Sequence, residues 1–212
     1  METGQWGNEL LRQVMATSVW EWIAVGAGVL QVLLARANNV WLYPAGIVST
    51  LLYVYLMLDA KLYAESALNA YYLVMSIYGW AHWLSRKGSV ALPITRWTPR
   101  EQSISAAVVV LGWALLYTVL ACYTDSTVPA WDALVSATAW AGMWLLARRK
   151  LENWILLNIS NALAIPLLVT KGLWLTAGLT LFLFIVAIFG YIEWRKLYKK
   201  QQRQRDASWS WQ

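Results

Sequence analysis

Cysteine and histidine are almost absent from this chain of 212 residues, which has one of each, Cys122 and His82. A single cysteine can form neither an intramolecular disulfide nor a cysteine-based metal cluster. One histidine leaves little from which to build a zinc site or a Ser-His-Asp triad. The sequence also lacks the glycine-rich Walker A pattern that binds ATP. We therefore predict no metal, no other cofactor and no enzyme activity.

Charge is scarce as well, because Asp, Glu, Lys and Arg make up 13% of the chain while apolar residues make up 59%. An average soluble domain has roughly 25% charged residues, and one core of this size could not bury so much apolar surface. The apolar residues gather in segments near the roughly 17–25 residues that a helix needs to cross a bilayer. We predict an all-α polytopic membrane protein with seven transmembrane helices and no cleavable signal peptide. The expected spans are 18–35, 40–58, 66–84, 104–121, 129–147, 154–170 and 173–193.

The 17 basic residues are unevenly distributed over the loops between these spans. With the N-terminus outside, only Arg12, Lys61 and Lys171 fall outside. The inner loops and the tail hold the other 14: Arg36, Arg86, Lys87, Arg96, Arg100, Arg148, Arg149, Lys150, Arg195, Lys196, Lys199, Lys200, Arg203 and Arg205. This bias predicts an N-out/C-in topology. We expect the lipid bilayer, and no nucleic acid, to be the partner of the basic tail.

Residues 19–83 and 130–194 are two copies of one layout of three apolar segments. Each copy opens with a Trp-acid pair, at Trp20 and Trp131, and the opening and closing anchors are displaced by the same 111 residues. Between the anchors we expect the offset to slip by one or two residues, so that residues 33–36 face residues 145–148. The predicted division is an N-terminal segment (1–17), a first three-helix bundle (18–84), a loop and linker helix (85–128), a second bundle (129–194) and a basic cytoplasmic tail (195–212). We expect residues 197–212 of the tail to be loosely ordered. Duplicated three-helix bundles are one way in which transporters build a central site.

No Asp, Glu, Lys or Arg lies in the middle third of a predicted span, which argues against an ion-driven pump. Polar residues do recur there at helical spacing, in one set of Trp154, Asn158 and Asn161 and another of Asn69, Tyr72 and Ser76. Each set predicts one helix face that points into the bundle, because an unpaired amide is costly in lipid. Such faces could hydrogen-bond a ligand. The alternative is that they only join helix to helix.

Pro44 and Pro166 lie in the second segment of each copy. Proline removes a backbone donor and kinks a helix. We predict that the two prolines are hinges for an alternating-access movement. The alternative is a static kink that a neighbouring helix fills.

Several motifs resemble the PnuC-type vitamin transporters over about residues 19–196. The first half carries WLYPAGIVS at 41–49, LYA at 62–64, Asn69 and SIYGW at 76–80, and the second carries RKLENW at 149–154, Asn161, KGL at 171–173 and GYIEW at 190–194. The resemblance implies a SWEET-like 3+1+3 fold, a homo-oligomer expected to be a trimer, and a location in the bacterial inner membrane. It also implies facilitated diffusion of an unphosphorylated vitamin, which a cytoplasmic kinase then traps.

The family's nicotinamide riboside signature is a Trp-x-x-Trp-x-x-x-Asn/Asp pattern, in which Trp154 and Asn161 match and Leu157 replaces the second tryptophan. The missing indole slightly favours thiamine over nicotinamide riboside, with riboflavin third. The predicted substrate-binding residues are Trp154, Asn158, Asn161, Asn69, Tyr72, Ser76 and Leu157. A non-transporting membrane receptor or scaffold is the alternative from a different class.

Overall fold

The computed structural model describes residues 3–59, 63–84, 92–124 and 126–209, and these ranges are almost entirely helical. The helices are α1 (Thr3–Ala16), α2 (Val19–Arg36), α3 (Leu42–Asp59), α4 (Tyr63–Leu84), α5 (Pro99–Tyr123), α6 (Pro129–Ala147), α7 (Asn153–Thr170) and α8 (Trp174–Trp209). Helices α2 to α8 follow the apolar segments of the sequence in order. Helix α1 lies in the N-terminal segment, for which no helix was predicted.

Five of these helices are long and apolar enough, by length and composition, to cross a membrane: α2, α3, α5, α7 and α8. Helices α4 and α6 have 22 and 19 residues, which is enough to reach across a bilayer core of about 30 Å. Polar, tyrosine and tryptophan residues lower their apolar character. The chain is therefore an all-helical membrane protein, and composition alone identifies fewer spans than the seven predicted.

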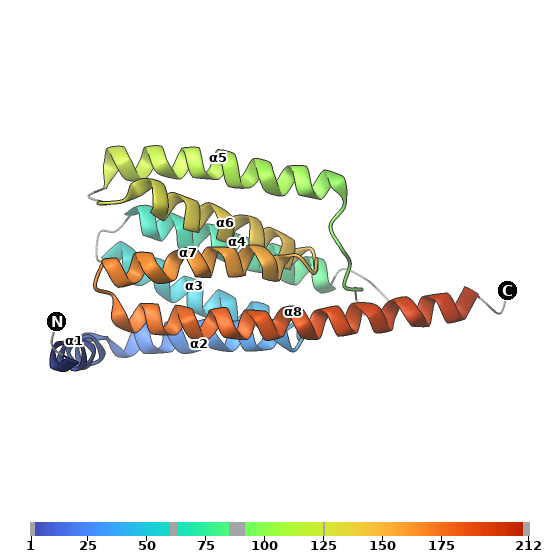
Figure 1. Cartoon of the computed structure of the whole chain (residues 1–212), viewed down its shortest axis with the longest axis horizontal. Coiled ribbons are helices and arrows are strands. Elements are labelled where there is room, and N and C mark those ends of the chain that lie inside the picture. The colour runs from blue at the N-terminus through green and yellow to red at the C-terminus, as the bar shows by residue number, and fades with distance from the viewer. Residues whose placement is uncertain (1–2, 60–62, 85–91, 125, 210–212) are drawn as a thin grey trace.

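Six helices form a closed ring in which α2 contacts α3, α3 contacts α4, α4 contacts α6, α6 contacts α7, α7 contacts α8, and α8 returns to α2. Helix α5 lies outside this ring and packs against α6 (Figure 1). Helix α1 lies at the opposite end of the bundle from the C-terminus, and α8 projects beyond all the other helices (Figure 1). The ring creates an interior that every one of its six helices can line.

The loops that follow α2 and α6 end these helices with the same backbone hydrogen bonds. The N–H of Asn39 donates to the carbonyl of Leu34, and the N–H of Lys150 donates to that of Leu145, both at 2.9 Å. This is the bonding of a Schellman motif, which ends a helix on a residue in the left-handed region. Corresponding residues are 111 apart here, so the predicted slip of the offset in this region is wrong.

The contact between the first two helices of each copy repeats at the same offset. The Ser49 hydroxyl on α3 donates to the carbonyl of Ala24 on α2, and the Ser160 hydroxyl on α7 donates to that of Val135 on α6, both at 2.8 Å. Serine bonded to a neighbouring backbone lets two apolar helices approach closely. Both pairs of helices are therefore held in the same register.

Four aromatic residues, which we call the aromatic quartet, fill the core at the end of the ring where α2 and α6 finish. Tyr43 and Trp83 meet edge to face at 5.2 Å, and their counterparts Trp154 and Trp194 do so at 5.7 Å. The two tryptophans that close the copies then meet at 6.2 Å. Because both copies supply the same edge-to-face pair, the quartet has an approximate two-fold symmetry.

Two indole hydrogen bonds cross between the copies in opposite directions. Trp83 Nε1 donates to the carbonyl of Ala147 at 3.2 Å, and Trp194 Nε1 donates to that of Ala35 at 2.9 Å. Each acceptor lies in the last turn of a helix, where carbonyls lack a partner within the helix. The copies are thus joined by a reciprocal pair of buried hydrogen bonds.

Arg149 lies beside this core and is only 5% exposed. Its guanidinium donates from Nε and Nη2 to Oδ1 of Asn38, at 3.0 and 2.7 Å. The central carbon of the guanidinium also lies over the Trp83 ring, 4.2 Å from its centroid. Asn38 and Arg149 are 111 residues apart and both have a positive φ, of 54° and 58°. Burial lowers the pKa of Arg149 to about 10, and nearby Tyr43 opposes this. The group stays charged at neutral pH and links the two loops.

Basic residues of the expected inner loops gather at this same end of the bundle. Glu152 is 2% exposed and accepts hydrogen bonds from Arg96 Nε at 3.1 Å and from the N–H of Trp97 at 2.9 Å. Glu101 in the first turn of α5 lies 3.0 Å from Nζ of Lys150. These ion pairs attach the segment before α5 to the α6–α7 loop. Lys61, Arg86 and Lys87, which also entered the charge count, lie outside the described residues.

The predicted loose order of the C-terminal tail is wrong as far as Trp209, because α8 continues without a break to that residue. Its Lys, Arg and Gln residues are good helix formers. The Gln201 side chain accepts a hydrogen bond from the N–H of Ile94 at 3.1 Å, and Gln202 donates to the Tyr198 hydroxyl at 2.8 Å. Tertiary contact therefore holds the start of this extension.

The two prolines do not occupy matching places. Pro44 is the third residue of α3, in the first turn, where its missing N–H costs no helical hydrogen bond. Pro166 lies inside α7. The prediction that each copy carries a kink at a corresponding proline is wrong, because the position 111 residues beyond Pro44 is Ile155. Only Pro166 removes a hydrogen bond from a helix interior.

Candidate functional site

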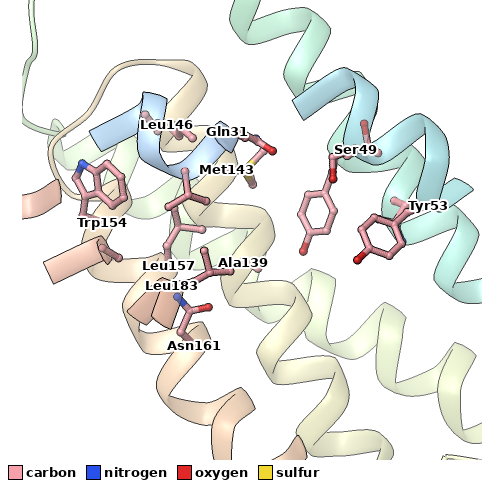
Figure 2. A pocket seen from close by; sticks show the side chains of 16 residues that line it. Gln31, Ser49, Tyr53, Ala139, Met143, Leu146, Trp154, Leu157, Asn161 and Leu183 are labelled. Carbon is pink, nitrogen blue, oxygen red and sulfur yellow. The ribbon is translucent and has the colours of Figure 1, made fainter. Parts of the chain in front are cut away.

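A cavity of about 260 Å³ lies inside the ring and is lined by residues from all six of its helices. Ser49 and Tyr53 lie across the space from Trp154, Leu157 and Asn161 (Figure 2). Ligand pockets commonly measure about 300–1,000 Å³. At about 260 Å³ the cavity lies just below this range, so it has room for no more than one small molecule.

Five of the seven predicted site residues line this cavity: Asn69, Tyr72, Trp154, Leu157 and Asn161. They come from α4 and α7, which belong to different bundles and both pack against α6. The two helix faces that were predicted separately from spacing thus meet at one space.

Ser76 and Asn158 do not line it. Ser76 on α4 is fully buried and is not part of the cavity wall. Asn158 lines a second groove, between α7 and α8, together with Ile155 and Ile159. Trp154 reaches both spaces. The prediction of one inward face for Trp154, Asn158 and Asn161 is therefore wrong for Asn158.

The two copies contribute different chemistry to the wall. The first bundle supplies the polar side chains Gln31, Ser49, Thr50, Tyr53, Asn69 and Tyr72. The second supplies Ala139, Met143, Leu146, Trp154, Leu157, Leu183 and Ala187, with Asn161 as its polar side chain. Every residue of the lining is neutral at pH 7. The cavity is thus amphiphilic, with a hydrogen-bonding side and an apolar side.

Several polar groups on the wall are available to a ligand. Thr50 and Ser49 are already used, because their hydroxyls donate to backbone carbonyls at 2.8 Å. Within the described parts of the chain, the amides of Gln31 and Asn161 have no hydrogen-bond partner. Polar groups in a protein interior are nearly always paired. Amides that face a cavity unpaired are suited to bind the polar atoms of a solute.

Trp154, one residue of the aromatic quartet, also forms part of the cavity wall. Its side chain is 2% exposed, and its ring lies against Gly190, where a Cβ would come within 2.7 Å of the indole. Trp194 meets it edge to face on the same side. The indole is therefore fixed in place, and the part that borders the cavity offers a rigid aromatic surface.

Sequence reasoning missed Gln31, Tyr53, Met143 and Leu183 as cavity residues. Gln31 stands alone among apolar residues of α2, so it forms no polar stripe. The constant offset could have found Leu183, because it corresponds to the predicted Tyr72. An internal repeat around a central axis places equivalent residues on opposite sides of one space.

A ring of apolar helices around an amphiphilic central cavity defines a membrane transporter for a small solute. The chain belongs to the nicotinamide mononucleotide transporter family, which it matches over residues 18–196. This confirms the resemblance to PnuC-type transporters and, with the apolar helices, the predicted location in the bacterial inner membrane.

Individual relatives agree with this assignment. The chain is 26% identical over 204 residues to the nicotinamide riboside transporter PnuC of Escherichia coli (strain K12), with 82% of this chain and 84% of the relative covered. It is 27% identical over 201 residues to the PnuC of Neisseria mucosa, with 86% and 74% covered. The crystal structure of the vitamin B3 transporter PnuC has the same fold, with a TM-score of 0.69, 23% identity, and 92% of this chain and 88% of that chain covered.

Proposed function

We propose that this protein carries an unphosphorylated cationic vitamin, nicotinamide riboside, into the cell by facilitated diffusion. The observation that carries the proposal is the amphiphilic cavity, whose polar side comes from α2 to α4 and whose apolar side comes from α6 to α8. A solute with a flat ring at one end and hydroxyl groups at the other matches such a wall.

Nicotinamide riboside fits this division of chemistry. Its ribose carries several hydroxyl groups, which suit the amides and phenols of the first bundle. Its pyridinium ring is flat and positively charged, so it gains from an aromatic surface such as Trp154 on the side of the second bundle. The relatives named as nicotinamide riboside transporters also favour this substrate.

Thiamine is the second candidate because Leu157 stands where the family signature has a second tryptophan. Leucine offers an apolar contact and no ring for stacking. Thiamine is also a permanent cation with flat rings, and it has one hydroxyl group that is phosphorylated after entry. The hydroxyl-rich side of the cavity favours the riboside over thiamine, and riboflavin, which is larger and neutral, comes third.

The neutral lining supports facilitated diffusion over ion coupling, since coupled transporters commonly carry ionisable groups within the membrane. Phosphorylation by a cytoplasmic kinase would then prevent the vitamin from leaving. We further propose that α2 to α8 all span the membrane as two bundles, 18–84 and 129–194, joined by a linker helix in 85–128. The N-terminus would be outside, the C-terminus inside, and the protein a homo-oligomer with three subunits.

Purified protein in proteoliposomes tests the proposal. Labelled nicotinamide riboside should enter the vesicles at zero ion gradient and stop at equal concentrations on both sides, with thiamine slower at the same concentration. Binding without flux would support the receptor alternative. Accumulation above equilibrium under a proton or sodium gradient would contradict facilitated diffusion.

A further inference from the structure

One pair of contacts breaks the repeat of the two copies in a reciprocal way. In the first copy a long side chain on α2, Gln31, lies over a glycine on α3, Gly46. A Cβ on Gly46 would be 2.7 Å from Cδ, 2.8 Å from Nε2 and 2.9 Å from Oε1 of that glutamine. In the second copy the long side chain is Leu157 on α7, and the glycine is Gly142 on α6, whose Cβ would be 2.8 Å from Cδ2 of the leucine.

The constant offset shows that these are the same two positions with their residues exchanged. Gln31 corresponds to Gly142, and Gly46 corresponds to Leu157, each 111 residues further along the chain. Each copy therefore has one long side chain and one glycine at this level, but on opposite helices. Both long side chains reach the cavity, one with an amide and one with an apolar group.

We propose that Gln31 determines substrate specificity by hydrogen-bonding the hydroxyl-bearing end of the vitamin, while Leu157 holds the ring side, so that the solute binds in one orientation. This inference rests on the function proposed above. Gly46 takes part indirectly, because only a residue without a Cβ leaves room for the amide at this depth.

The surroundings of Gln31 support a role in binding. Its amide has no hydrogen-bond partner within the described residues, although it lies in the interior of the bundle. The side chain is partly buried and borders the cavity, so its amide is open to a bound solute. A group that only filled space between α2 and α3 could be apolar, as Leu157 is. The amide therefore has a use in the solute-bound state.

The test compares Gln31→Leu, which keeps the size and removes the amide, with Gln102→Leu, the same change at an exposed position on the outer helix α5. Binding of nicotinamide riboside and thiamine to purified protein is measured by calorimetry, and folding is followed by thermal unfolding. We expect Gln31→Leu to weaken binding at least tenfold at an unchanged unfolding temperature, and Gln102→Leu to leave it unchanged. Equal affinity of Gln31→Leu and the unmodified protein would overturn the proposal.

The 1-methylnicotinamide cation tests the orientation, because it has the ring and carboxamide of the riboside and no ribose. Gln31→Leu should change the affinity for 1-methylnicotinamide by less than twofold. An equal loss of affinity for both ligands would show that Gln31 does not bind the hydroxyl-bearing end. Gly46→Ala gives a second route, since it displaces the amide without removing it. Gly46→Ala should weaken the binding of nicotinamide riboside more than the binding of 1-methylnicotinamide. If the unmodified protein binds neither vitamin, the proposed function fails instead, which is a separate outcome.

Discussion

The packing of Trp154 against α8 can be tested by comparing an alanine substitution at Gly190, which touches the indole, with the same substitution at Gly178, which does not. Both glycines lie in α8, and nothing lies within 4 Å of a Cβ built on Gly178. A Cβ on Gly190 would come 2.7 Å from Cζ2 and 2.8 Å from Cε2 of the Trp154 ring. Real Cβ atoms do not approach a ring so closely, so Gly190→Ala must move a rigid indole that is only 2% exposed.

The expected magnitudes follow from two opposing effects. Replacing glycine by alanine inside a helix gains about 1 kcal/mol from helix propensity. Overpacking a well-filled core costs about 1–3 kcal/mol. Gly178→Ala should be stabilised by helix propensity alone. Gly190→Ala has the same gain but also the overpacking cost, so the two variants should differ by about 2 kcal/mol in the free energy of unfolding. For a chain of this size that is about 4–8 °C in the unfolding temperature.

Thermal unfolding of the purified protein in detergent, followed by circular dichroism, provides the assay. Gly178→Ala should unfold at or above the temperature of the unmodified protein and Gly190→Ala below it. Binding gives an independent readout, because Trp154 borders the cavity and its displacement should also lower the affinity for the vitamin. If Gly190→Ala is as stable as Gly178→Ala and binds equally well, Trp154 is not held against α8 as described.

Three further substitutions test separate contacts. Asn161→Ala should weaken vitamin binding by about 0.5–1.5 kcal/mol, the usual worth of one hydrogen bond, whereas Asn158→Ala should leave it unchanged; the same loss for both would show that the second groove belongs to the site. Trp194→Phe removes one of the two indole bonds between the copies; because the carbonyl of Ala35 still accepts the N–H of Asn38, the loss should be that of one hydrogen bond, about 0.5–1.5 kcal/mol of unfolding free energy. Asn38→Gly keeps the left-handed backbone but removes the acceptor of Arg149, and a loss below about 1 kcal/mol in denaturant unfolding would contradict the buried pairing, since bonds to charged groups contribute about 1.5–3 kcal/mol.

The helices could be predicted from the sequence because the length of an apolar run limits what it can be. The C-terminal extension could not, since Gln201 is held by the N–H of Ile94, a residue more than a hundred positions away. Hydropathy carries no information about such a contact. The sequence predicts a kink at Pro44 because it does not show where α3 begins. The structure places this proline in the first turn, where it interrupts no helical hydrogen bond.

The site was predicted in part, and the reason lies in the geometry of α7. At 3.6 residues per turn, Leu157 and Asn161 lie about 60° and 20° to one side of Trp154, and Asn158 lies about 40° to the other. The spacing correctly groups these residues on one broad face. It cannot show that the face is divided between the cavity and the outer groove, because that depends on where α8 packs. Gln31 was missed because one amide in an apolar helix makes no pattern.

The reciprocal indole bonds have a meaning for the origin of the chain. In a dimer of one three-helix unit, Trp83 and Trp194 would be the same residue, and their two hydrogen bonds would form an isologous contact in which every substitution acts twice. Once both units are in one chain, each side can change alone. The bonds at the quartet have kept the old symmetry, while Gln31 opposite Gly142 has lost it. Joining two such units in one chain would thus let a symmetric frame recognise the proposed vitamin, which has two different ends.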